Sequence, residues 1–116
     1  MKKYSTHVMK KEAFFLDEFK KKVLHAYPER VKSMILFGSR AAGTARRDSD
    51  FDVFIMVDRR ERDLVDGIFD IAYEIYIQSD LEVDISPVIM SEEYFQNRLS
   101  QERRIALEIA EKGIAL

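Results

Sequence analysis

The sequence has no cysteine, only two prolines and two histidines, and no long hydrophobic run. The lack of cysteine excludes disulfides, thiolate zinc sites and cysteine nucleophiles. His7 and His25 lie 18 residues apart, which argues against a histidine-based metal site. The longest apolar run, residues 53–57, has five residues, whereas a membrane-spanning helix needs ~20. The charged N-terminus lacks an apolar segment, so we expect no signal peptide and a cytoplasmic location.

An excess of charge of one sign is also missing. The chain has 19 basic and 21 acidic residues, for a net charge of -2, and 47% of its residues are hydrophobic. This balance excludes disorder and disfavours a protein dedicated to binding duplex DNA. At 116 residues, the chain is long enough for one domain with its own core, so we expect residues 1–116 to form a single domain.

Hydrophobic spacing predicts an α/β domain, with helices packed on a small sheet. Helical periodicity covers residues 10–26 and 61–78, and two further short helices follow residue 90, with Ser91 as an N-cap and Gly113 as a C-cap. Gly67 lies inside a predicted helix, where we expect it to allow close packing. Apolar runs predict strands at residues 33–37, 51–57 and 81–90, with Pro87 marking an edge or an end of the third strand.

A phosphate-binding turn is one interpretation of Gly38 and Ser39, which directly follow the first strand. Glycine permits a tight turn and a close approach of the backbone. A short helix that begins at Ser39 would point free amide groups at an anion, and the hydroxyl would add a donor. The alternative is an ordinary turn between a strand and a helix, with Ser39 as its cap.

Asp50 and Asp52 begin the second strand and share one of its faces. Two neighbouring carboxylates repel each other unless they are exposed, protonated or bound to a cation. Oxygen ligands suit magnesium, which takes one or two carboxylates together with substrate phosphates. The alternative is a pair of solvated acids at the end of a strand.

Asp84 is an acid between Val83 and Ile85 in the third apolar run. If this strand neighbours the second, Asp84 joins Asp50 and Asp52 around a pair of divalent cations. Two such ions can hold the attacking and leaving oxygens of a displacement in line. The alternative is that Asp84 lies on a solvent-facing side of the strand with Glu82 and Ser86.

Together these residues resemble the nucleotidyltransferase (DNA polymerase beta) superfamily. Gly38-Ser39, ten intervening residues and then Asp50-Phe51-Asp52 match its signature, and the surrounding FGSRAAGTARRDSDFDVFI is similar to its minimal nucleotidyltransferase branch. The resemblance covers about residues 34–89. Residues 1–6 have no counterpart in the family pattern.

The resemblance implies a nucleotidyltransferase fold, with a small mixed sheet of three or more strands. It implies that Asp50 and Asp52 ligate two Mg²⁺ ions, and that Asp84 helps to ligate the second and activates the acceptor hydroxyl. Gly38 and Ser39 would hold the β- and γ-phosphates of ATP. Members of this branch commonly pair with a HEPN-domain RNase toxin, and some neutralise it by transferring AMP to a toxin tyrosine.

Positive charge for a triphosphate is available from Arg40, Arg46 and Arg47, which lie inside the motif segment. The guanidinium fork suits phosphate oxygens, and we assign Arg40 and Arg47 to nucleotide binding. The alternative is that these arginines only solubilise the surface. The residues after Met90 suffice for two short helices, so we expect a partner protein to supply part of the acceptor surface.

Three functions fit these observations. The first is an adenylyltransferase that modifies its HEPN partner in a hetero-oligomer. The second is a non-catalytic antitoxin that blocks the partner by binding, through exposed apolar residues such as Tyr73, Tyr76, Tyr94 and Phe95, unless these belong to the core. The third is a transferase, or a subunit of one, that acts on a small molecule or an RNA end, which the balanced charge disfavours.

Overall fold

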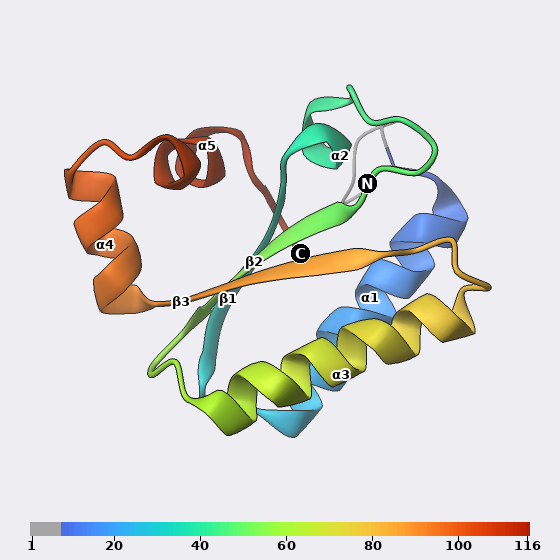
Figure 1. The fold of residues 1–116 in the computed structure, drawn as a ribbon, viewed down its shortest axis with the longest axis horizontal. Helices are drawn as coiled ribbons and strands as arrows, with labels where there is room; N and C mark the ends of the chain where they lie inside the picture. The colour runs from blue at the N-terminus through green and yellow to red at the C-terminus, as the bar shows by residue number, and fades with distance from the viewer. Residues whose placement is uncertain (1–7) are drawn as a thin grey trace.

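The computed structural model describes residues 8–116, so the N-terminal segment that matched no family pattern lies outside the described residues. A four-stranded mixed sheet carries five helices (Figure 1). In chain order the elements are α1 (Lys10–Ala26), β1 (Val31–Phe37), α2 (Ser39–Ala42), β2 (Phe51–Val57), α3 (Arg62–Gln78), β3 (Ile85–Ser91), α4 (Glu92–Ser100), α5 (Arg104–Lys112) and β4 (Ile114–Ala115).

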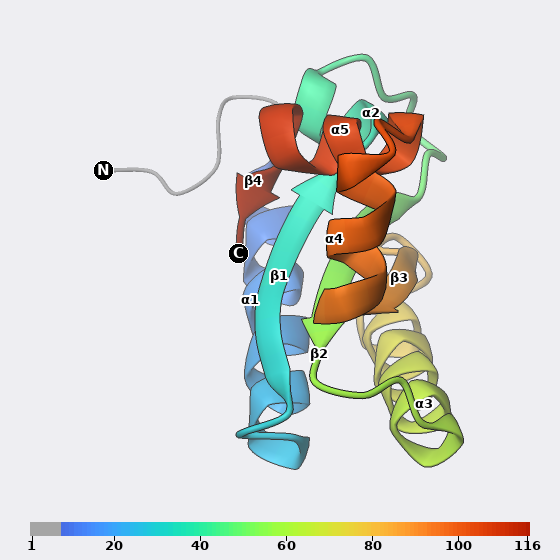
Figure 2. The ribbon, with the colours of Figure 1, turned by 90° about the vertical axis from the view of Figure 1, so that its left-hand side faces the viewer.

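The sheet has the order β3-β2-β1-β4. β1 is antiparallel to β2 and to β4, and β2 is parallel to β3. Figure 2 shows β1 running toward α2 and β2 running away from it. This arrangement places the end of β1 and the starts of β2 and β3 at the same edge of the sheet.

Alternating residues of the strands feed two apolar cores. Phe51, Val53 and Ile55 of β2 face one core, where they pack with α1 and α3 residues such as Phe19 and Ile68. In the other core, beneath α4 and α5, residues of the opposite face pack with residues of these two helices: Phe37, Phe54 and Met90 with Phe95, Ala106 and Ile109. The two pairs of helices therefore cover opposite faces of the sheet (Figures 1 and 2). None of the helices in the described part of the chain has the length and apolar character needed to cross a bilayer.

The predicted third strand began four residues too early. β3 starts at Ile85 rather than at residue 81, because Asp80 and Leu81 adopt positive φ angles of 55° and 65° that reverse the chain after α3. Asp84 therefore lies just before β3 and not in the middle of a strand. Pro87 lies inside β3, where it is tolerated because β3 is an edge strand.

Several finer predictions are confirmed. Ser91 caps α4 by accepting a hydrogen bond from the Tyr94 amide, and Gly113 ends α5. Gly67 allows close packing, because a Cβ atom there would overlap the Tyr27 hydroxyl. The two-residue strand β4 was not predicted; it is too short to show a period, and it exists through its pairing with β1.

Candidate active site

The sheet brings the motif residues to one edge. Phe37, the last residue of β1, pairs with Asp52, so Gly38 follows directly beside that acid. Phe51 pairs with Ile85, and the Phe51 amide donates a 2.8 Å hydrogen bond to the Asp84 carbonyl. Neighbouring strands are separated by about 5 Å. Gly38, the pair Asp50 and Asp52, and Asp84 therefore form a row across the ends of three adjacent strands.

Asp50 is the central acid of this row. Partial burial raises the pKa of Asp52 above its ordinary value of 3.8, and the charges of Asp50 and Glu108 raise it further. Burial also raises the pKa of Asp84, and to this are added the charge of Asp50 and a hydrogen bond to its side chain. Asp84 is exposed, yet its carboxyl group is turned toward Asp50. Compared with carboxyl groups in free solution, Asp52 and Asp84 therefore favour the neutral form, or an ionised form with a cation beside it.

Gly38 makes close contact with this row. Its φ of 75° is unfavourable for residues with a side chain, and a Cβ atom at this position would overlap Asp52 Oδ2. Gly38 is the N-cap of α2, which begins at Ser39 as the sequence predicts. The turn therefore presents backbone beside a carboxylate, with the amide end of a short helical turn next to it.

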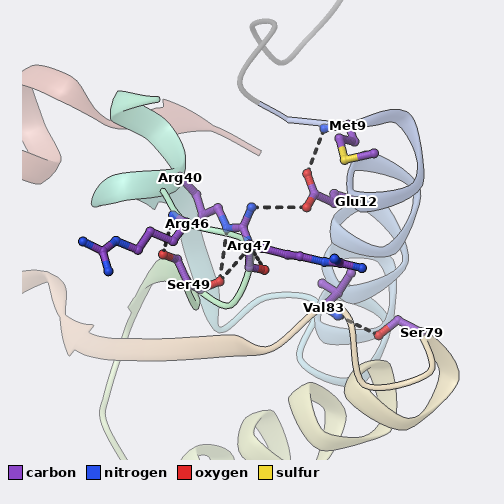
Figure 3. Close-up of polar contacts among 8 residues, drawn as sticks. All are labelled: Met9, Glu12, Arg40, Arg46, Arg47, Ser49, Ser79 and Val83. Atoms are coloured by element: carbon purple, nitrogen blue, oxygen red, sulfur yellow. Dashed lines mark hydrogen bonds and ion pairs between the residues drawn. The ribbon is translucent and has the colours of Figure 1, made fainter. Parts of the chain in front are cut away.

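Arg40 has a different position from the one we predicted. It is only 7% exposed, and its guanidinium donates to the Ser49 carbonyl at 2.9 and 3.1 Å and to the Arg47 carbonyl at 3.1 Å. It also forms an ion pair with Glu12 at 3.2 Å (Figure 3). Its guanidinium carbon lies 4.2 Å from the centre of the Phe51 ring. These contacts use its donors inside the protein, so Arg40 holds the loop before β2 against α1 rather than facing a phosphate.

Arg46 and Arg47 are exposed and point in opposite directions (Figure 3). The Arg46 amide donates a 2.8 Å hydrogen bond to Ser49 Oγ, which shapes the loop. Arg47 borders a cavity of about 660 Å³ that is also lined by Asp84 and Glu82. Arg47 is therefore the arginine of the motif whose charge lies in a cavity beside the acids.

The carboxylates at this edge lie in pairs, and a pair of carboxylates suits a magnesium ion. Within residues 8–116, no three His, Cys, Asp or Glu side chains form one metal-ligating group. Asp50 instead interacts with Asp52 and, separately, with Asp84. Mg²⁺ binds one or two carboxylates and completes its shell with phosphate oxygens and water. The carboxylates of Asp50 and Asp52, next to a turn without side-chain bulk, match that requirement.

Two residues near the site were missed by the sequence reasoning. Glu12 of α1 accepts hydrogen bonds from Arg40 and from the Met9 amide, and Glu108 of α5 raises the pKa of Asp52. Both lie on amphipathic helices, where an acid is ordinarily a solvated residue. No spacing in the sequence connects either of them to the motif.

Comparison with known proteins identifies the family. The sequence model of the nucleotidyltransferase domain matches residues 16–111, and the chain belongs to this family. No curated protein matches the chain. One similar solved structure is a toxin-antitoxin crystal structure with AMP-PNP, which is 20% identical with a TM-score of 0.50. Another is a mutant of the toxin-antitoxin MntA-HpeT, which is 16% identical with a TM-score of 0.52. Each alignment covers 85% of this chain and 70% of the other, and the likeness is one of fold.

The two arginines are expected to respond differently to substitution. Arg40→Ala leaves Glu12 without its buried partner, and we expect it to lower the free energy of unfolding by about 3–5 kcal/mol. Arg47→Ala removes an exposed side chain, and should change that free energy by less than about 0.5 kcal/mol. Urea denaturation of both variants measures the difference. Equal stabilities would contradict the structural role of Arg40.

Partial burial, together with the charges of Asp50 and Glu108, raises the pKa of Asp52 and predicts that Asp52→Asn stabilises the fold at neutral pH. A carboxyl group whose pKa is raised by folding destabilises the folded state when it is ionised, and this effect disappears as the pH falls toward the unfolded value of 3.8. We therefore expect a higher Tm than wild type at pH 7.5 and a smaller gain at pH 5. Glu111→Gln, at an exposed acid of α5, is the control. A loss of stability at pH 7.5 would contradict this account.

Gly38→Ala tests the contact between the turn and the acid. The alanine must adopt a positive φ, and its Cβ atom must displace the Asp52 carboxylate. We expect a loss of about 1–3 kcal/mol in the free energy of unfolding. Gly43, which has a φ of 80° but lies at the other end of α2, is the matched control for backbone strain alone. Urea denaturation measures both losses, and a loss in Gly38→Ala no larger than that in Gly43→Ala would contradict the contact with Asp52.

Proposed function

We propose that this protein is a Mg²⁺-dependent nucleotidyltransferase that transfers AMP from ATP to a tyrosine hydroxyl of a HEPN-type RNase toxin, and thereby acts as an antitoxin. The observation that carries the proposal is the row of Gly38, Asp52, Asp50 and Asp84 at one edge of the sheet. It combines a turn without side-chain bulk with acids that favour a nearby cation. Membership of the nucleotidyltransferase family supports the reaction class.

Each residue has a distinct part in this proposal. Gly38 and Ser39 bind the β- and γ-phosphates through their backbone amides and the Ser39 hydroxyl. Arg47, an exposed arginine of the loop between Gly38 and Asp50, would add positive charge for the phosphates. Asp50 and Asp52, with Asp84 for the second ion, would hold two Mg²⁺ ions, which neutralise the phosphate charge and align the reacting oxygens. Arg40 keeps the loop that carries Arg47 and Asp50 in place.

The reaction is a displacement at the α-phosphorus of ATP. The tyrosine oxygen forms a bond to this phosphorus, and the bond to the bridging oxygen of the β-phosphate breaks, so pyrophosphate leaves. The hydroxyl proton passes to the Asp84 carboxylate and then to solvent. Asp84 suits this step because its pKa is raised toward that of a useful base.

The partner assignment rests on the sequence resemblance and on the similar structures. The minimal nucleotidyltransferase branch pairs with HEPN toxins, and both structures described above are toxin-antitoxin structures. The adenine nucleotide is supported in the same way, because one of them contains AMP-PNP.

Co-expression with a HEPN protein encoded beside this gene tests the proposal. We expect the intact mass of the partner to increase by one or more AMP groups, in a reaction that requires ATP and Mg²⁺. Asp52→Asn should lower the transfer rate at least about 100-fold, because it removes a charge while it keeps the shape of the side chain. Far-UV circular dichroism and the Tm of the variant verify that it is folded.

Two outcomes would redirect the assignment. A partner that is inhibited but unmodified would favour the binding antitoxin. Transfer of AMP to a small molecule or to an RNA end, with the HEPN protein unmodified, would favour the third function. Full activity of Asp52→Asn would contradict the metal-binding role of this acid.

A further inference from the structure

A cavity of about 410 Å³ lies between α3 and the start of β3. Asp50 and Asp84 line it on one side, and Phe69, Tyr73 and Tyr76 of α3 line it on the other. Cavities of this volume lie within the usual range of ligand pockets. Acidic oxygens therefore face aromatic side chains across a space that is open to a ligand.

The aromatic wall continues onto the exposed surface of α3. Phe69 and Tyr73 are 48% and 65% exposed, although both side chains carry a large apolar ring. At 100° per residue they share a face of the helix with exposed Asp66, Asp70 and Ile77. An exposed apolar stripe with acids along it is typical of a surface that binds another protein, and its charge is complementary to a basic segment.

The position of the cavity in the row of acids indicates which reacting group it would receive. Gly38 contacts Asp52, Asp52 interacts with Asp50, and Asp50 interacts with Asp84. The cavity touches Asp50 and Asp84 but neither Gly38 nor Asp52, so it lies at the end of the row away from the phosphate turn. In phosphoryl transfer the attacking and leaving oxygens are roughly in line on opposite sides of the phosphorus. The attacking group would therefore arrive from the Asp84 end of the row, which this cavity borders.

We propose that this cavity is the acceptor site, and that it takes an aromatic hydroxyl side chain on a basic segment of the partner protein, held by Phe69 and Tyr73. This inference rests on the proposed function and adds the surface that selects the acceptor. The ring packs between the aromatic side chains, and its hydroxyl reaches the carboxylates of Asp50 and Asp84. Lys and Arg residues beside the acceptor contact Asp66 and Asp70.

The larger cavity beside Asp84 suits this acceptor less well. It does not border Asp50, and the exposed aromatic side chains of α3 that would hold a ring do not line it. Tyr76 and Asp84 border both cavities, so neither residue distinguishes them. Phe69 and Tyr73 border the smaller one and not the larger, which makes them the informative positions.

Steady-state kinetics with the purified HEPN partner and ATP test the acceptor site. We expect Tyr73→Ala to raise the KM for the partner about tenfold or more, while the KM for ATP stays within twofold of wild type. Tyr73→Phe keeps the ring and should restore the wild-type KM. Phe14→Ala, at an exposed aromatic residue of α1, is the matched control and should change neither constant.

The outcomes separate the two proposals. If wild type transfers no AMP to the partner, both the proposed function and the acceptor site are contradicted. If wild type is active but Tyr73→Ala has an unchanged KM for the partner, only the acceptor site is contradicted. A rise in the KM for ATP alone would mean that the cavity holds the nucleotide, which also overturns the inference.

Charge provides a second, independent measurement. We expect Asp70→Lys to lower kcat/KM for the partner and to weaken its dependence on salt, because an attractive charge on the rim is reversed. Glu111→Lys, on α5, should do neither. Peptide mapping of the product should place AMP on a tyrosine flanked by Lys or Arg. Modification of a residue in an acidic segment, or equal effects of both variants, would overturn the inference.

Discussion

The backbone pairing of three strand ends is the constraint on which the site depends. The acids do not hold one another in place, since Asp50 raises the pKa of both Asp52 and Asp84. The sheet brings them together, through the pairing of Phe37 with Asp52 and the hydrogen bond from the Phe51 amide to the Asp84 carbonyl. That pairing is fixed by the core, because a slip of one residue in β2 would exchange its two faces and bury Asp52. Packing energy thus offsets a local repulsion that is useful for binding a cation.

The loop before β2 adds a second level of support. Arg40 binds the Ser49 and Arg47 carbonyls and Glu12, so one buried cation connects α2, the loop and α1. A guanidinium can do this because its donors lie in a rigid plane and its flat face stacks on the Phe51 ring. The arginines of the motif segment therefore have two different roles. Arg40 makes the loop rigid, and that rigid loop presents the exposed Arg47 to the cavity beside the acids.

Local patterns in the sequence predicted most of this structure. Helical spacing and apolar runs gave α1 and β2 their correct limits, and the turn at Gly38 and the acids at positions 50 and 52 were recognised from their order along the chain. The start of β3 was wrong because alternation at residues 81–84 imitated a strand, while positive φ angles at Asp80 and Leu81 actually form a turn. The internal contacts of Arg40 could not be predicted, for another reason. A basic residue inside a motif gives no sign of its burial, and its partner Glu12 lies 28 residues away.

The distribution of helices explains why α3 is the helix that lies beside Asp84. After β3 the chain crosses to the other face of the sheet, where Phe95 of α4 packs against Phe54 with ring centres 4.7 Å apart. These last helices thereby bring Glu108 to the side of Asp52, and they leave the end of the row at Asp84 to α3. On that helix the buried residues Ile68 and Ile75 face α1 and the sheet, while Phe69 and Tyr73 lie outside this core. Exposed aromatic side chains beside a set of mutually repelling acids are the features on which the proposed acceptor site is based.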